Sequence, residues 1–129
     1  SLNQLRVSQI IEAHGWLGTD VVSPFASQAL FLVVQHAELP MQERYAPLLR
    51  RAVAEGKADA GNLAYLEDRI LMRQGKPQRY GSQIVADKST GAWILYQVED
   101  PENLDKRRAT VGLGPIAAYL EATGAVWRK

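Results

Sequence analysis

The sequence predicts a mainly α domain, in which five or six helices surround a buried central helix and one β-hairpin packs against them. Three observations predict this fold class. Between residues 2 and 75, apolar residues recur at helical spacing and are interrupted by glycines and prolines. Residues 62–75 are apolar on nearly every side, which is typical of a helix inside a domain. After Pro77 the sequence becomes rich in β-branched and aromatic residues, which favour strands.

Composition limits the class of protein. The 129 residues are enough for a domain with its own core, so we predict a single domain over residues 1–129. A net charge of +1 argues against nucleic-acid binding, and no apolar run approaches the roughly 18 residues that suggest a membrane span. The absence of cysteine excludes disulfides and thiol catalysis. The compartment is left open, with the cytoplasm slightly favoured.

Four helices are predicted before Pro77. Residues 2–14 form the first helix, which Gly15 ends. The second begins at Ser23, a capping residue, and runs to about residue 38. Residues 40–55 form the third helix, and the central helix runs from about residue 60 to Gly75. The predicted inward face of the second helix consists of Phe25, Ala29, Leu32, Val33 and His36.

Two strands and two helices are predicted after Pro77. The strands cover residues 78–85 and 92–98, and residues 87–91 form a polar hairpin loop that ends in glycine. Two strands alone are marginally stable, so the hairpin must lie on the helices. Asp100 and Pro101 begin the next helix as cap and first residue. Gly112 interrupts it, and residues 115–123 form the last helix.

Three consecutive charges, Glu67, Asp68 and Arg69, lie in the middle of the central helix. Residues three and four positions apart share a helical face, so Glu67 and Asp68 lie among apolar neighbours. Charged groups are costly to bury unless they are paired or hydrogen-bonded. Some group must therefore compensate these charges, which makes this block the most informative part of the sequence.

Polar residues at partly buried positions form the candidate site. If the helices and the hairpin meet, these side chains converge on one cleft. We predict that His36 acts as acid or base and that Asp68 orients it, as carboxylates do for catalytic histidines. Arg69 would hold a carboxylate or phosphate of the ligand. The predicted ligand-binding residues are Gln35 and Glu67 from the helices, Arg69, and Tyr80 and Gln83 from the first strand, beside Ser82.

This cluster predicts a small enzyme or enzyme-like domain for a polar metabolite or peptide-derived group, with hydrolysis or proton transfer as its reaction. Buried polar networks also serve fold specificity alone, so the same residues suit a non-catalytic interaction or accessory domain. An interaction module would hold a protein partner at the hairpin edge or in a helix groove. A polar cleft with His36 near Asp68 would favour the enzyme, and an exposed apolar patch the module.

We expect no cofactor and no metal, because two histidines are few for a zinc site. The small polar ligand remains the expected partner, and a protein partner or homo-oligomer is left open. We expect neither nucleic acid nor membrane as a partner.

Four segments resemble the motifs of an uncharacterised bacterial family, catalogued only as a domain of unknown function. They are VQHAE at residues 34–38, LAYLEDRILMRQGKPQRYGSQ at residues 63–83, EDPENLDKRR at residues 99–108 and VGLGPI at residues 111–116. The resemblance spans nearly the whole chain and implies no reaction. It implies that relatives carry a further N-terminal segment with an Asp-Gln pair and an arginine, which the domain here would lack. The motif positions are Gln35, His36, Asp68, Arg69, Gln78, Tyr80, Gly81, Gln83, Asp100, Pro101, Asp105, Arg107 and Arg108.

Overall fold

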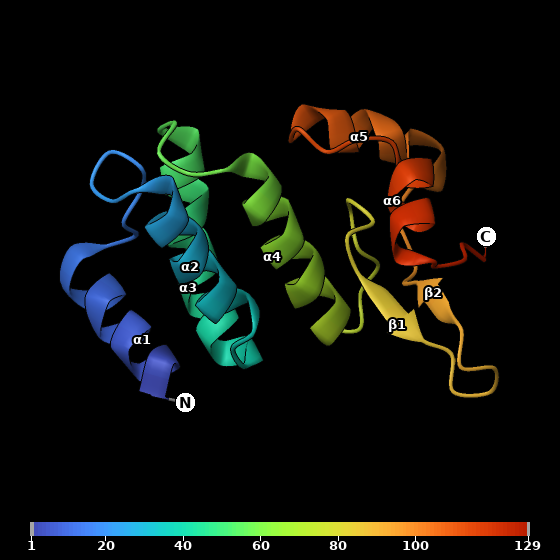
Figure 1. Cartoon of the computed structure of the whole chain (residues 1–129), viewed down its shortest axis with the longest axis horizontal. Coiled ribbons are helices and arrows are strands. Elements are labelled where there is room, and N and C mark those ends of the chain that lie inside the picture. Colours follow the sequence, from blue (N-terminus) through green and yellow to red (C-terminus); the bar gives the residue numbers. More distant parts are fainter. Residues whose placement is uncertain (1, 129) are drawn as a thin grey trace. The chain divides into compact units, whose positions relative to one another are not determined.

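The computed structural model describes residues 2–128, and its helices and strands are shown in Figure 1. The mainly α class with one β-hairpin is confirmed. In chain order the elements are α1 (Leu2–His14), α2 (Pro24–Gln35), α3 (Leu39–Ala54), α4 (Ala60–Arg73), β1 (Ile84–Ala86), β2 (Trp93–Leu95), the 3-10 helix η1 (Pro101–Asn103), α5 (Leu104–Thr110) and α6 (Ile116–Thr123). None of these helices is long and apolar enough to cross a membrane.

The chain forms two compact units, residues 1–66 and residues 67–129. The boundary falls within α4, after Leu66. The prediction of a single domain is not tested by this division and stays a prediction.

The first unit contains α1, α2, α3 and the first half of α4. The Ala26 backbone N–H donates to Ser23 Oγ at 3.1 Å, so α2 begins with the cap that the sequence predicts. Between α1 and α3, the Tyr45 hydroxyl donates to Glu12 at 2.9 Å. The interior consists mainly of aliphatic and aromatic side chains, with Gln35 and Gln42 among them. The buried apolar side chains include Ile11, Phe31, Val34, Tyr45, Leu49 and Leu66.

The predicted inward face of α2 is wrong. Phe25 is 85% exposed and His36 is also exposed, whereas Phe31 and Val34 are buried. The helix is apolar on most of its sides, so more than one face has helical spacing and periodicity does not choose between them. The helix also ends at Gln35 rather than near residue 38, and His36 is its C-cap.

The second unit contains the hairpin, α5 and α6, together with the last turns of α4. Strands β1 and β2 are antiparallel, with Val85 opposite Ile94. On the far side of β2, Val126 exchanges two backbone hydrogen bonds of 2.9 Å with Trp93 and Leu95. As predicted, the hairpin packs on helices. The core that joins them consists of Leu95, Leu104 and Ile116, flanked by Ile84, Val98, Tyr119, Leu120 and Trp127.

Two predictions of local structure in this unit need correction. Each strand has three residues instead of seven or eight, so Tyr80, Ser82 and Gln83 lie in the segment before β1 and not on a strand. The reason is that backbone N–H groups in this segment donate to side chains rather than to a neighbouring strand. Asp100 also makes no cap hydrogen bond; its backbone is left-handed (φ 43°) and η1 follows it.

The polar hairpin loop at residues 87–91 is confirmed, and Asp87 organises it. Asp87 Oδ1 accepts from the backbone N–H and the hydroxyl of Ser89, at 2.9 and 2.8 Å. Arg128 donates to Asp87 Oδ2. These hydrogen bonds hold the pKa of Asp87 below its usual range, and the bond from Arg128 has the largest effect. A carboxylate with a lowered pKa stabilises the fold above its unfolded pKa, and this contribution is lost as the pH falls through the folded pKa.

Replacing Arg128 by glutamine should raise the pKa of Asp87 toward the ordinary aspartate value of about 3.9, because the largest cause of its shift is removed. An NMR pH titration of the Asp87 side chain measures this change. Lys88→Gln removes the same charge from the neighbouring residue and should leave the titration in place. An unchanged midpoint in Arg128→Gln would show that Ser89 alone sets it.

Gly81 should tolerate alanine less well than Gly91. Both have positive φ, 68° and 74°, which a side chain adopts at a penalty of roughly 1–2 kcal/mol. A Cβ at Gly81 would also lie 3.1 Å from Ile116 and 3.2 Å from Leu104, whereas one at Gly91 meets nothing within 4 Å. Crowding a packed core adds roughly 1–3 kcal/mol, so urea unfolding should show the larger loss for Gly81→Ala. Equal losses would contradict the packing of this core.

Candidate functional site

The Asp68 carboxylate is fully buried on α4, and the segment that follows the helix surrounds it. Its Oδ1 accepts from the backbone N–H groups of Arg79 and Tyr80, at 2.8 and 3.0 Å. Its Oδ2 accepts from the Ser82 N–H at 3.1 Å and from the Ser82 hydroxyl at 2.7 Å. A carboxylate has about four acceptor positions, so these four bonds use them all. Oriented N–H and O–H dipoles, rather than a cation, compensate the charge that the sequence places here.

The fully buried Gln78 side chain contacts the same segment on the side away from Asp68. Its Oε1 accepts from the Gln83 N–H at 2.8 Å, and its Nε2 donates to the carbonyls of Gln83 and Tyr96, at 3.0 and 2.9 Å. The amide side chain therefore takes the place of a strand partner for the N–H group of residue 83, whose carbonyl also accepts from the Tyr96 N–H at 3.1 Å. Residues 78–83, which we call the anchored loop, are thus held by side chains on both faces.

Two arginines of α5 fix the anchored loop from outside. Arg108 is buried and donates to the carbonyls of Tyr80 and Gly114, at 2.8 and 2.6 Å. Arg107 donates to the Arg79 carbonyl at 2.8 Å. The resemblance marks Gln78, Arg107 and Arg108, but helical periodicity does not select them. No local sequence pattern could identify these three residues, because their partners are backbone carbonyls and N–H groups elsewhere in the chain.

Arg69 and Gln83 extend the network toward the surface of the unit. Arg69 Nε donates to Gln83 Oε1 at 3.0 Å, and Gln83 Nε2 donates to Ser82 Oγ at 3.0 Å. Partial burial, and then the nearby positive charge of Arg73, lower the pKa of Arg69. The Tyr80 ring lies under the Arg79 guanidinium, 5.4 Å from its centre. Arg69 therefore reaches the Asp68 carboxylate through two intervening side chains.

The remaining predicted residues lie in the first unit or at its boundary. Gln35 is buried, and its Nε2 donates to the Tyr65 carbonyl at 3.2 Å. The exposed His36 donates from Nδ1 to the Leu32 carbonyl one turn back, at 2.8 Å. Glu67 is partly buried on α4. The structure thus brings Asp68, Arg69, Ser82 and Gln83 together with the Tyr80 backbone, and the pairing of His36 with Asp68 stays a prediction.

A model of a family of unknown function, DUF6624, matches residues 1–126, nearly the whole chain. The chain belongs to this family. No curated protein and no solved structure matches it. Membership in DUF6624 confirms the family resemblance of the sequence and supplies no reaction, so the chemistry of the chain has to be argued from its own residues.

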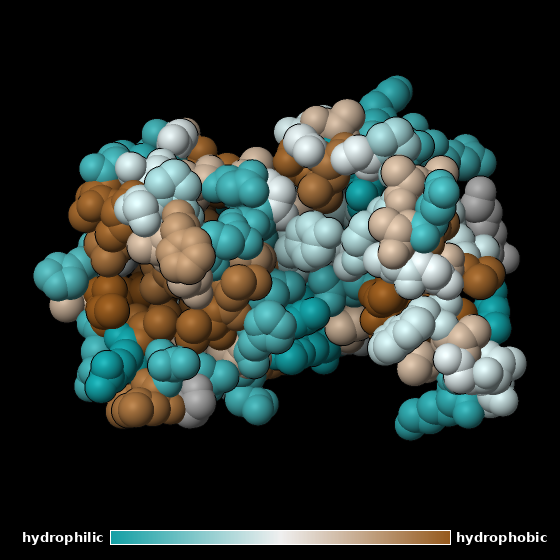
Figure 2. Space-filling model, in the orientation of Figure 1, coloured by the Kyte–Doolittle hydropathy of each residue, from teal (hydrophilic) through white to brown (hydrophobic). Residues whose placement is uncertain are grey.

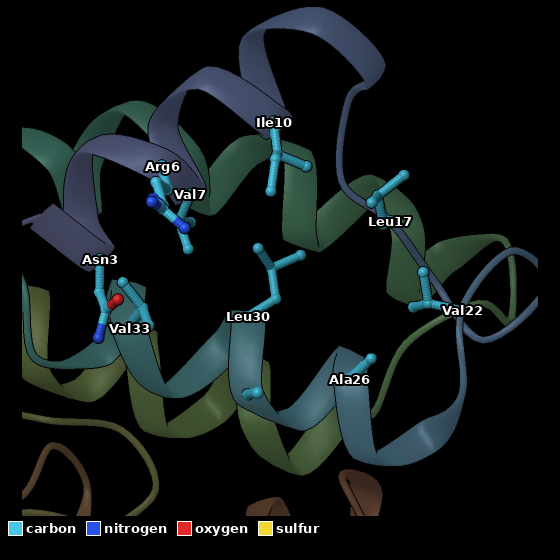
Figure 3. Close-up of a pocket in the computed structure, with 10 residues that line it drawn as sticks. Asn3, Arg6, Val7, Ile10, Leu17, Val22, Ala26, Leu30 and Val33 are labelled. Carbon is cyan, nitrogen blue, oxygen red and sulfur yellow. The ribbon is translucent and has the colours of Figure 1, made fainter.

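An apolar groove of about 470 Å³ lies between α1 and α2 of the DUF6624 chain. In Figure 3, Val7 and Ile10 of α1 face Leu30 of α2 across this space. Figure 2 shows hydrophobic residues gathered over these two helices. The residues that line the α1/α2 groove are Asn3, Arg6, Val7, Ile10, Leu17, Val22, Ala26, Ala29, Leu30 and Val33.

A second pocket of about 390 Å³ lies between the loop after α1 and the end of α3. Its charged groups pair with one another: Lys57 lies 3.6 Å from Asp20 and 3.7 Å from Glu55. Among residues 2–128, no three histidine or acidic side chains are grouped as metal ligands would be. The α1/α2 groove is therefore the more distinctive feature of the first unit.

Asp68→Asn should destabilise the chain by on the order of 3 kcal/mol, because an amide group would face backbone donors that then lose their acceptor. His36→Gln should change stability by less than about 0.5 kcal/mol, since His36 is exposed and bonds only within its own helix. Urea unfolding of both variants beside the parent measures these differences. A stable Asp68→Asn variant would mean that the four hydrogen bonds contribute little to the fold.

Proposed function

We propose that this chain is a non-catalytic binding module, whose α1/α2 groove holds an apolar group of its ligand or partner. The observation that carries the proposal is the groove itself, about 470 Å³ between two helices and lined mainly by aliphatic side chains. Ligand pockets typically measure roughly 300–1,000 Å³ and are mostly apolar with a few polar groups. The volume and the lining of the groove both fit this description.

Exposed apolar side chains on the elements that form the groove support the same function. Leu5 on α1 and Val21 before α2 are 56% and 67% exposed, and Phe25 on α2 is 85% exposed. Large exposed apolar patches mark interaction sites on soluble domains. Single exposed apolar residues are ordinary, but here three of them lie on the elements that form the groove.

The hydrogen bonds of the second unit favour a scaffold role over catalysis for the motif residues there. The acceptor positions of Asp68 are all used by the anchored loop. Gln78 likewise makes three bonds to the backbone. A catalytic carboxylate or amide needs a position left for its substrate, so these two residues are better suited to shaping the loop.

The neutral dye N-phenyl-1-naphthylamine, which fluoresces in apolar surroundings, tests this proposal. We expect the folded chain to bind it with a blue-shifted emission. Ala26 is exposed on α2 and faces the groove (Figure 3). Ala26→Trp should abolish most of the signal, because its indole would occupy the apolar end of the groove.

Ala54→Trp is the matched control, since Ala54 is exposed at the end of α3 and lines no part of the groove. It should keep the dye signal, and circular dichroism should show both variants to be folded. Failure of the dye to bind, or equal binding by both variants, would overturn the groove as the binding site.

A further inference from the structure

We infer that the ligand of the α1/α2 groove is a single-chain anionic amphiphile, with its acyl chain along the apolar walls and its carboxylate at Arg6. This inference rests on the proposed function and names the ligand class for the same groove. Three observations carry it: the polarity of the groove changes from one end to the other, its charge has one sign, and its length is that of a short helix segment.

The polarity of the groove changes along its length. Figure 3 shows Asn3 and Arg6 at one end, beside Val33. At the other end, Leu17 and Val22 from the loop between α1 and α2 border the space, together with Ala26. Between them the walls are formed by Val7, Ile10 and Leu30. One polar end and one apolar end match a molecule with a single head and a single tail. A peptide helix would present polar backbone termini at both ends.

The only charge among the ten lining residues is that of Arg6. Within residues 2–128, the side chains of Arg6 and Asn3 have no ion-pair or hydrogen-bond partner. An arginine guanidinium binds a carboxylate through two parallel N–H donors, and an asparagine amide can add a third. The groove therefore favours an anionic head over a neutral one and disfavours a cationic head.

The length of the groove suits a chain of medium length. Asn3 and Ile10 are seven residues apart on one helix, which corresponds to about 10 Å along its axis. A chain that lies along Val7, Ile10 and Leu30 buries its methylene groups against them one after another. Each added methylene should tighten binding about fourfold until the chain reaches Leu17 and Val22.

Isothermal titration with hexanoate, octanoate and decanoate, each at concentrations where it is monomeric, tests the inference. Decanol and decyltrimethylammonium serve as neutral and cationic probes of the same chain length. We expect decanoate to bind more tightly than octanoate, and decyltrimethylammonium to bind more weakly than decanol. Arg6→Gln should weaken decanoate binding about three- to fivefold and leave decanol unchanged, which is the range expected for a partly exposed ion pair.

Lys88→Gln is the matched control, because it removes the same charge from an exposed residue of the hairpin loop. It should leave all affinities unchanged. Equal binding of the three ten-carbon probes, or equal effects of Arg6→Gln and Lys88→Gln, would overturn the anionic head. So would decanoate binding that survives Ala26→Trp. If the parent binds the neutral dye and Ala26→Trp does not, the proposed function stands even where these tests exclude the anionic ligand. If the parent binds neither the dye nor decanoate, the proposed function and the ligand class are both wrong.

Discussion

The buried carboxylate of Asp68 is the constraint on which the second unit depends. A negative charge without contact with water has to be stabilised by donors held in place, and the chain supplies them from the anchored loop that follows α4. Because all four donors belong to residues 79–82, and three of them are backbone N–H groups, the carboxylate fixes the path of that loop. The loop then delivers the chain into β1, where the hairpin begins.

Several other residues that the resemblance marks act on the same loop. Gln78 bonds across its base, and Arg107 and Arg108 bind carbonyls on its outer side. Gly81 supplies the left-handed backbone that lets the loop approach Leu104 and Ile116. Most backbone donors and acceptors of the loop thus have a partner. Five of the positions that the sequence resemblance marks, Asp68, Gln78, Gly81, Arg107 and Arg108, therefore hold or shape this loop.

Much of the fold follows from local sequence, and its failures have physical causes. The Ser23–Pro24 start of α2 and the Asp87–Gly91 loop were predictable because capping and turn preferences act over a few residues. The strand predicted at residues 78–85 was wrong before β1. Backbone N–H groups of residues 79–83 bond to the side chains of Asp68 and Gln78, whereas a strand pattern assumes a neighbouring strand. The need to compensate Asp68 was predictable from its apolar neighbours. The identity of the compensating donors was not, since they lie 11 to 14 residues further along the chain.

The α1/α2 groove is likewise a feature that local sequence does not predict. The sequence shows α2 as apolar on most sides, and only the packed structure shows which side remains open. A helix with more apolar surface than its own unit covers leaves some of it available to a ligand. The division of roles that we propose follows: the anchored loop stabilises one unit, and the groove of the other unit binds.

Native-state amide hydrogen exchange at Arg79, Tyr80 and Ser82, followed by NMR, tests the central role of Asp68 most directly. None of these three N–H groups donates to the backbone of a neighbouring strand; all donate to one carboxylate. If Asp68 anchors the loop, these amides exchange only when the unit unfolds, with protection equal to that of the β1 and β2 core. Exchange near the rate of an unstructured chain would contradict the account.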